Sequence, residues 1–343
     1  MRAASLIVLF CSSLALAQSG GGGNPSFDQP AERPQDRARQ EGRIDLRPRF
    51  EKGQSIKLKM EVVNAATQPA IAILDDPSDE PQRPSPQKKP ANKPGTRPGS
   101  NPNAKPDLET TKSKVEFGIV MNVKDVTAAG EATVDMTFQT VKVLIDGPGF
   151  KQEFDSTRPP QPAKPGEPDI MSTVLRPLVG STFTMTIDRA GNISSVTGGE
   201  GFAMLGQVTP GAGGTLPQVF GPILTQKKGD GFARVGESWE NADHLNSGLM
   251  GEFKMLTRHT LQSVSGKDAK LSIRGQISPA SMAPGSSTFQ LKDSAYSGSY
   301  TWDTARGMIR DMATRMSITV EHSLQGQPVE VKSETTTKVT RLD

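Results

Sequence analysis

The feature that most constrains the fold is a long alternation of residue types near the C-terminus. From residue 312 to residue 324, every second position reads Met, Thr, Met, Ile, Val, His and Leu. The intervening positions include Arg315, Ser317, Thr319 and Glu321. Successive side chains of a β-strand point to opposite faces, so this period of two predicts a half-buried antiparallel strand.

Two further segments complete a C-terminal hairpin system. Residues 296–302 contain three aromatic β-formers, and residues 303–307 (Asp-Thr-Ala-Arg-Gly) carry turn chemistry. Residues 329–339 alternate Val, Ser and Thr with charged side chains. The C-terminal region therefore predicts consecutive antiparallel strands joined by short turns.

Similar alternation recurs through most of the remaining chain. Strands are predicted at 56–62, 115–123, 134–145, 183–187, 253–261, 271–277 and 289–291. The apolar parity changes after Phe138 and resumes at Val141, which predicts a β-bulge near residues 139–140. A bulge bends a sheet, so we expect a mainly β protein built on a strongly curved antiparallel sheet or incomplete barrel, with a few short helices on its concave side. A β-sandwich is the alternative.

The N-terminus has the pattern of an export signal. Arg2 precedes a short apolar run, and residues 15–17 (Ala-Leu-Ala) form a small-x-small cleavage site. We expect residues 1–17 to be a signal peptide, cleaved after Ala17, and the protein to be exported to the periplasm or beyond. The only cysteine, Cys11, lies inside this segment, so a mature chain would contain no disulfide, thiolate zinc site or cysteine nucleophile.

Three segments have the composition of unstructured chain. Residues 18–42 are rich in Gly, Pro, Gln and charge and are predicted to be a disordered tether. Residues 75–112 form a proline-rich insert, and residues 156–168 form a second proline-rich loop. The two proline-rich segments interrupt a single β-rich domain that spans residues 43–342.

Charge and motifs exclude several classes of function. The formal net charge of +3 is small and signs are mixed along the strands, so nucleic acid is not an expected partner. Outside the N-terminal run, no segment is apolar enough to predict a membrane span. The chain contains no nucleophile elbow, phosphate-binding loop, dinucleotide fingerprint or two-histidine zinc helix, so we expect no cofactor, no metal and no catalytic residue.

The inward-facing residues nevertheless suggest a binding surface. Methionine adapts to irregular apolar partners, and seven methionines share the apolar parity of the predicted strands. Two histidines also fall on that parity, where they could meet as a metal pair, line a ligand site or simply pack in the core. The candidate ligand-binding residues are Met60, Met121, Met136, Met185, Met255, Met312, Met316, His259 and His322.

Two short motifs in the C-terminal half of the chain resemble those of an uncharacterised family. Residues 301–303 (Thr-Trp-Asp) with Gly307, and residues 235–239 (Val-Gly-Glu-Ser-Trp), are similar to those of secreted bacterial β-rich proteins of unknown function. In that family a strand–Asp–x–x–x–Gly–strand hairpin closes the domain. The resemblance implies a β-rich fold and export, and it implies no activity.

These observations favour an exported, non-enzymatic envelope protein that binds a lipid or another apolar small molecule. A structural or partner-binding secreted protein, with another envelope protein as its partner, is the first alternative. An enzyme that uses His259 and His322 with a metal is the second.

Overall fold

The computed structural model describes residues 42–69, 108–159, 170–198, 220, 223–224, 230–246, 252–279, 289–324 and 327–342. The predicted signal peptide, nearly all of the predicted tether and most of both proline-rich segments lie outside these residues. The strands are β1 (Ile44–Asp45), β2 (Ser55–Pro69), β3 (Leu108–Val126), β4 (Ala132–Gly147), β5 (Phe150–Asp155), β6 (Thr182–Ile187), β7 (Ile193–Thr197), β8 (Phe232–Ala233), β9 (Ser238–Asn246), β10 (Glu252–Ser265), β11 (Asp268–Pro279), β12 (Phe289–Asp303), β13 (Met308–Leu324) and β14 (Gln327–Arg341).

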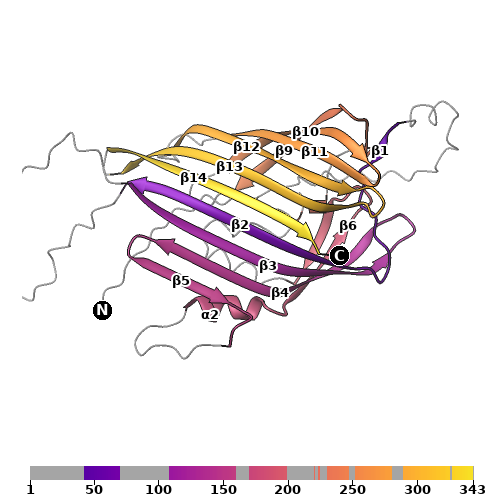
Figure 1. The fold of residues 1–343 in the computed structure, drawn as a ribbon, viewed down its shortest axis with the longest axis horizontal. Coiled ribbons are helices and arrows are strands. Elements are labelled where there is room, and N and C mark those ends of the chain that lie inside the picture. Colours follow the sequence, from indigo (N-terminus) through magenta and orange to yellow (C-terminus); the bar gives the residue numbers. More distant parts are fainter. Residues whose placement is uncertain are drawn as a thin grey trace, which may run out of the picture.

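Twelve of these strands form one antiparallel sheet, shown in Figure 1. Its order is β7-β6-β4-β3-β2-β14-β13-β12-β11-β10-β9, and β5 pairs with β4 beside this path. The first long strand and the last strand of the chain are therefore neighbours at the centre of the sheet. Nearly all other neighbours are consecutive in sequence, which explains why local alternation and turn chemistry predicted the strands well.

The predicted class is confirmed, and its predicted shape needs correction. The protein is mainly β and antiparallel, but the sheet is neither closed nor strongly curled. Strands β7 and β9 end the order and pair with each other nowhere in the described residues. The observed arrangement fits an open sheet or a β-sandwich. Period-two patterns reveal which residues face inward, but total curvature depends on the twist summed over all neighbouring strands, which no local pattern encodes.

The predicted β-bulge is present. Gly118 lies opposite Thr140 and Ile119 lies opposite Phe138, so Gln139 is the extra residue in β4. The first part of β4 pairs with β6 and the part after the bulge pairs with β5. The bulge thus marks the point where one strand changes partners while its apolar side chains keep facing the core.

One predicted boundary is wrong. The first residues of β3, Leu108 to Lys112, lie within the stretch predicted to be the proline-rich insert, yet they pair with the end of β2. Residues 109–112 read Glu-Thr-Thr-Lys, and Thr110 shares a side-chain hydrogen bond of 3.0 Å with Thr67 across the two strands. β-Branched threonines stabilise such cross-strand pairs, and the last proline of the insert precedes them.

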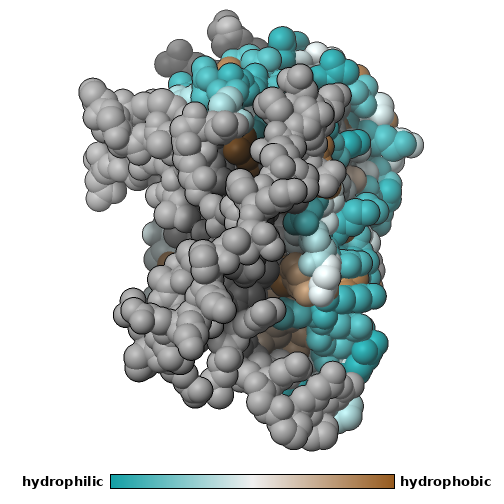
Figure 2. Space-filling view, turned by 90° about the vertical axis from the view of Figure 1, so that its left-hand side faces the viewer, coloured by the Kyte–Doolittle hydropathy of each residue, from teal (hydrophilic) through white to brown (hydrophobic). Residues whose placement is uncertain are grey.

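The two faces of the sheet differ in chemistry. The outer face carries cross-strand ion pairs such as Lys59–Glu116 at 3.2 Å and Arg315–Glu334 at 2.7 Å. The inner face forms one continuous apolar cluster that extends from β7 to β10. In Figure 2, hydrophilic residues dominate the margin of the described surface and hydrophobic residues lie inside it. A sheet with this asymmetry has one wet face and one face that must be covered.

Short helical elements contribute to the covered face. Helix α2 (Ile170–Leu175) and the 3-10 turn η1 (Arg176–Leu178) lie beside β4 and β5. They bury Met171, Leu175 and Leu178 in the core. Phe220 also joins this core, with its ring 5.7 Å from that of Phe183 on β6.

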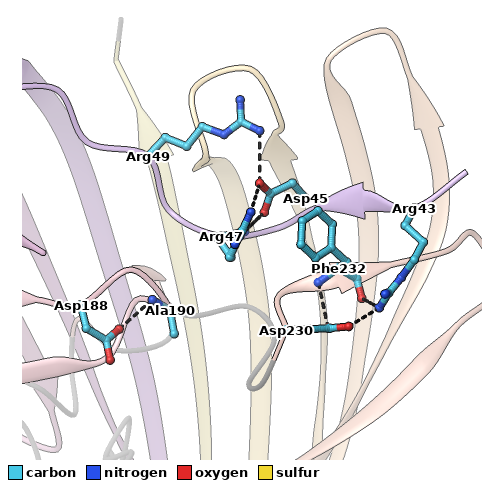
Figure 3. A network of polar contacts seen from close by, with 8 residues as sticks. All are labelled: Arg43, Asp45, Arg47, Arg49, Asp188, Ala190, Asp230 and Phe232. Carbon is cyan, nitrogen blue, oxygen red and sulfur yellow. Dashed lines mark hydrogen bonds and ion pairs between the residues drawn. The ribbon is translucent and has the colours of Figure 1, made fainter. Parts of the chain in front are cut away.

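A strap formed by residues 43–50 crosses the end of the sheet (Figure 3). Its strand β1 pairs with β8, and Leu46 is buried. Arg47 donates to Asp45 at 2.9 Å and lies over the Phe232 ring, 4.5 Å from its centre. Arg49 adds a second bond to Asp45 at 3.3 Å. Burial alone would raise the pKa of Asp45, but its bonds to Arg47 outweigh burial, so that pKa is lowered.

Candidate functional site

The structure places all seven candidate methionines on the inner face. They come from strands at both sides of the sheet, and each is at most 6% exposed. Two lie on one strand opposite tyrosines: Met312 lies opposite Tyr300 on one side and Val339 on the other, and Met316 lies opposite Tyr296. Met60 extends the first of these rows, because it also pairs with Val339. The seven are Met60, Met121, Met136, Met185, Met255, Met312 and Met316.

A polar cluster is built into this apolar face on strands β9 to β12. His259 on β10 is 7% exposed and lies between side chains of neighbouring strands. Its Nδ1 is 3.0 Å from the Tyr300 hydroxyl on β12, and its Nε2 is 3.2 Å from the Thr257 hydroxyl. The Asn241 amide on β9 is 3.4 Å from Nε2, and the Trp239 ring stacks on the imidazole with 5.8 Å between ring centres.

The hydrogen bonds define how the cluster shares its protons. With its amide nitrogen facing Nε2, Asn241 donates to that nitrogen, and the ring proton is accordingly assigned to Nδ1. Nδ1 then donates to the Tyr300 oxygen, which leaves the phenolic hydrogen free to donate elsewhere. The Thr257 hydroxyl donates its one hydrogen to Nε2 at 3.2 Å, and the backbone carbonyl of Asn241 is a second, longer acceptor at 3.4 Å.

The cluster is electrically neutral. Burial disfavours the imidazolium and lowers the pKa of His259 to about 4. Burial likewise raises the pKa of Tyr300 well above its usual value. Both groups therefore stay uncharged at neutral pH. Among the described residues the partners of the ring are hydroxyls and an amide, and none of them is a carboxylate of the kind that orients a catalytic histidine.

One polar atom of the cluster has no partner within the described part of the chain. The Asn241 side chain is on a residue only 7% exposed, yet its carbonyl oxygen Oδ1 accepts no hydrogen bond there. A buried, unsatisfied acceptor costs about 1 to 3 kcal/mol, so such atoms are rare unless something else binds them.

A second polar patch lies at the centre of the same face. Asn64 on β2 donates to Thr335 at 3.0 Å and to Ser333 at 3.3 Å, both on β14. Thr337 lies on the same strand, opposite Thr314 on β13. These residues are buried and uncharged, so the inner face combines apolar side chains with hydroxyl and amide groups.

The two candidate histidines do not lie in the same row of paired residues across the sheet. In the row that contains His259, the paired residues are Ile273, Gly298 and then Thr314 on β13. The backbone of His322 pairs with Val329, eight residues farther along β13. At about 3.3 Å per residue, that offset alone is roughly 26 Å. The side chain of His322 lies outside the described residues.

Two findings concern the described ranges as a whole. No group of three or more His, Cys, Asp and Glu side chains in them is placed to hold a metal ion. No helix in them is long and apolar enough to cross a membrane.

Sequence reasoning found His259 but missed its partners. Tyr300, Asn241 and Thr257 come from three strands, and only the pairing register places them around one imidazole. The sequence does indicate that Thr257 and His259 share one face, because they lie two residues apart on one strand. It does not indicate that residues of β9 and β12 lie beside them, because the pairing register between strands cannot be predicted from any one segment.

Fold and site together define a class: an open antiparallel β-sheet protein with one apolar inner face and a neutral polar cluster within it. Residues 129–208, which span β4 to β7, match the profile of a family of unknown function, DUF6263. The predicted resemblance to an uncharacterised family is confirmed at that level, although the matched residues include neither quoted motif. A search of curated proteins found no match.

Proposed function

We propose that this protein is an exported, non-enzymatic envelope protein that binds a lipid or similar apolar ligand on the inner face of its sheet. The observation that carries the proposal is the asymmetry of one large open sheet. Its outer face bears ion pairs, and its inner face gathers seven methionines and the His259 cluster. An extended face of adaptable apolar side chains suits a flexible acyl chain.

The export signal supports the location in this proposal. Residues 1–17 have the charge, apolar run and cleavage site of a signal peptide, and a mature chain without cysteine is compatible with an oxidising compartment. The environment of His259 supports a binding role over catalysis, because its described partners include no carboxylate that would orient and stabilise a catalytic imidazolium.

Photo-crosslinking tests the proposal directly. The mature protein is incubated with a fatty acid that carries a diazirine in its acyl chain, irradiated and digested, and the labelled residues are located by mass spectrometry. We expect label on inward residues such as Met255, Met312 and Met316. The adjacent outward residues Arg315 and Ser317 serve as internal controls. Label on outward positions alone, or no saturable label, would contradict the proposal.

The alternative of a partner-binding envelope protein has a separate signature. It rests on the proline-rich segment 75–107, which as an extended solvated chain could reach another protein. Deleting that segment would abolish partner capture in the envelope and leave acyl-chain labelling intact. Under the lipid-binding proposal, the deletion variant labels as well as the full mature chain.

A further inference from the structure

The polar cluster around His259 indicates what kind of ligand the apolar face would accept. The cluster sits among methionines: Tyr300 lies opposite Met312, Tyr296 lies opposite Met316, and Met255 is two residues from Thr257 on the same strand. A ligand that contacts these methionines with its acyl chain would bring its polar end within reach of the cluster.

The free hydrogen-bonding capacity of the cluster is specific. Asn241 Oδ1 is a buried acceptor without a described partner, so it requires a donor. The Tyr300 hydroxyl has His259 as its partner in the described part of the chain, and its own hydrogen remains available to an acceptor. The cluster therefore offers one acceptor and one donor, which suits a head group with hydroxyl or amide groups.

The lack of charge in the cluster further limits the kind of head group that could bind there. The four hydrogen-bonding side chains of the cluster are an imidazole, a phenol, an alcohol and an amide, and none carries a charge at neutral pH. Burying a carboxylate or phosphate beside them without a compensating cation is strongly unfavourable. An anionic head group is therefore disfavoured at this position.

From these observations we infer that His259, Tyr300, Asn241 and Thr257 form a head-group site for an uncharged amphiphile that bears hydroxyl or amide groups. The inference rests on the proposed function, since it assigns the polar end of the same ligand. Asn241 accepts a hydrogen bond from the head group and Tyr300 donates one to it. His259 contacts both side chains through its two ring nitrogens, and Thr257 holds the imidazole in place.

Three probes with the same acyl chain test the inference on the full mature protein. Monolauroylglycerol carries two neutral hydroxyls, methyl laurate carries no donor, and laurate is an anion at neutral pH. Calorimetric titration measures the affinity of each, and the imidazole ¹⁵N shifts of His259 report contact at the cluster. We expect monolauroylglycerol to bind at least tenfold more tightly than either other probe and to shift the His259 signals.

Variants locate the preference. Asn241→Leu keeps the side-chain volume and removes the acceptor, so we expect it to bind methyl laurate normally and to lose the preference for monolauroylglycerol. Asn122→Leu makes the same change at an exposed outward position of β3 and should behave as the unsubstituted protein. If Asn241→Leu does not fold, Thr257→Val replaces it, because this change removes the hydroxyl that contacts Nε2 of His259 and so loosens the cluster.

The possible outcomes distinguish failure of the head-group site from failure of the proposed lipid-binding function. Equal affinity for all three probes, or a preference that survives in Asn241→Leu, overturns the head-group site and leaves the proposed function standing. Binding of none of the probes overturns both. A preference for laurate also overturns the inference, because it would require a cation that the cluster does not contain.

Discussion

At the residue scale, the most informative position is His259. Its burial between Trp239 and Tyr300 keeps the imidazole neutral, and the pKa of about 4 lies well below the value of about 6.5 for an exposed histidine. Each hydrogen bond within the cluster is neutral to neutral. This position therefore couples the stability of the fold to pH.

We predict that the protein loses stability in mild acid through His259. The folded state resists protonation, so the stabilisation is fully present above pH 6.5, the unfolded value, and is lost as pH falls toward 4. The difference of about 2.5 pH units corresponds to roughly 3 kcal/mol. Urea unfolding between pH 7.5 and 4, compared with His259→Gln, measures it. Identical pH profiles for the two proteins would refute this assignment.

A second residue-scale prediction concerns the buried ion pair between Arg341 and Asp303. Burial alone would raise the pKa of Asp303, but the Arg341 guanidinium at 2.8 Å outweighs burial and lowers it. Arg341→Met would leave a buried carboxylate without this partner, and we expect a loss of about 3 kcal/mol in chemical denaturation. The exposed pair gives the control: Arg315→Met should cost less than about 1 kcal/mol. Equal costs would contradict the account.

At the element scale, the alternating pattern predicted where strands lie and which residues face inward. The bulge at Gln139 and the turn at 303–307 follow from local signals in the sequence. The short strands β1 and β8 escaped prediction, because two residues carry no periodicity, and β5 and β9 were not predicted either. The Asn241–His259–Tyr300 contacts also escaped, because they depend on register between strands and not on any one strand.

The bulge yields an element-scale prediction. Deleting Gln139 would restore regular pairing with β3 and regular alternation in β4, so that Val141, Val143 and Ile145 still face the core. We therefore expect the deletion variant to fold cooperatively, as judged by near-ultraviolet circular dichroism and thermal unfolding. Gln139→Val keeps the extra residue at an exposed position and should change stability by less than about 0.5 kcal/mol. A deletion variant that fails to fold cooperatively would contradict this account, because it would show that β4 needs the extra residue to keep its apolar side chains inward.

At the scale of the whole molecule, the central pairing of β2 with β14 joins the two halves of the chain into one sheet. That pairing makes the inner face continuous from the β6–β7 edge to the β9 edge, so methionines far apart in sequence line one surface. An apolar face of this extent is the basis for the proposal that the protein binds a lipid or a related amphiphile.

The measurement that tests this central claim most directly is native mass spectrometry of the mature protein, purified gently from the envelope of its own host and followed by organic extraction. The account predicts a stoichiometric adduct that dissociates to an uncharged amphiphile with an acyl chain. A bare protein that also shows no mass shift after incubation with lipids extracted from the same envelope would contradict it, and would assign the protein a structural or partner-binding role.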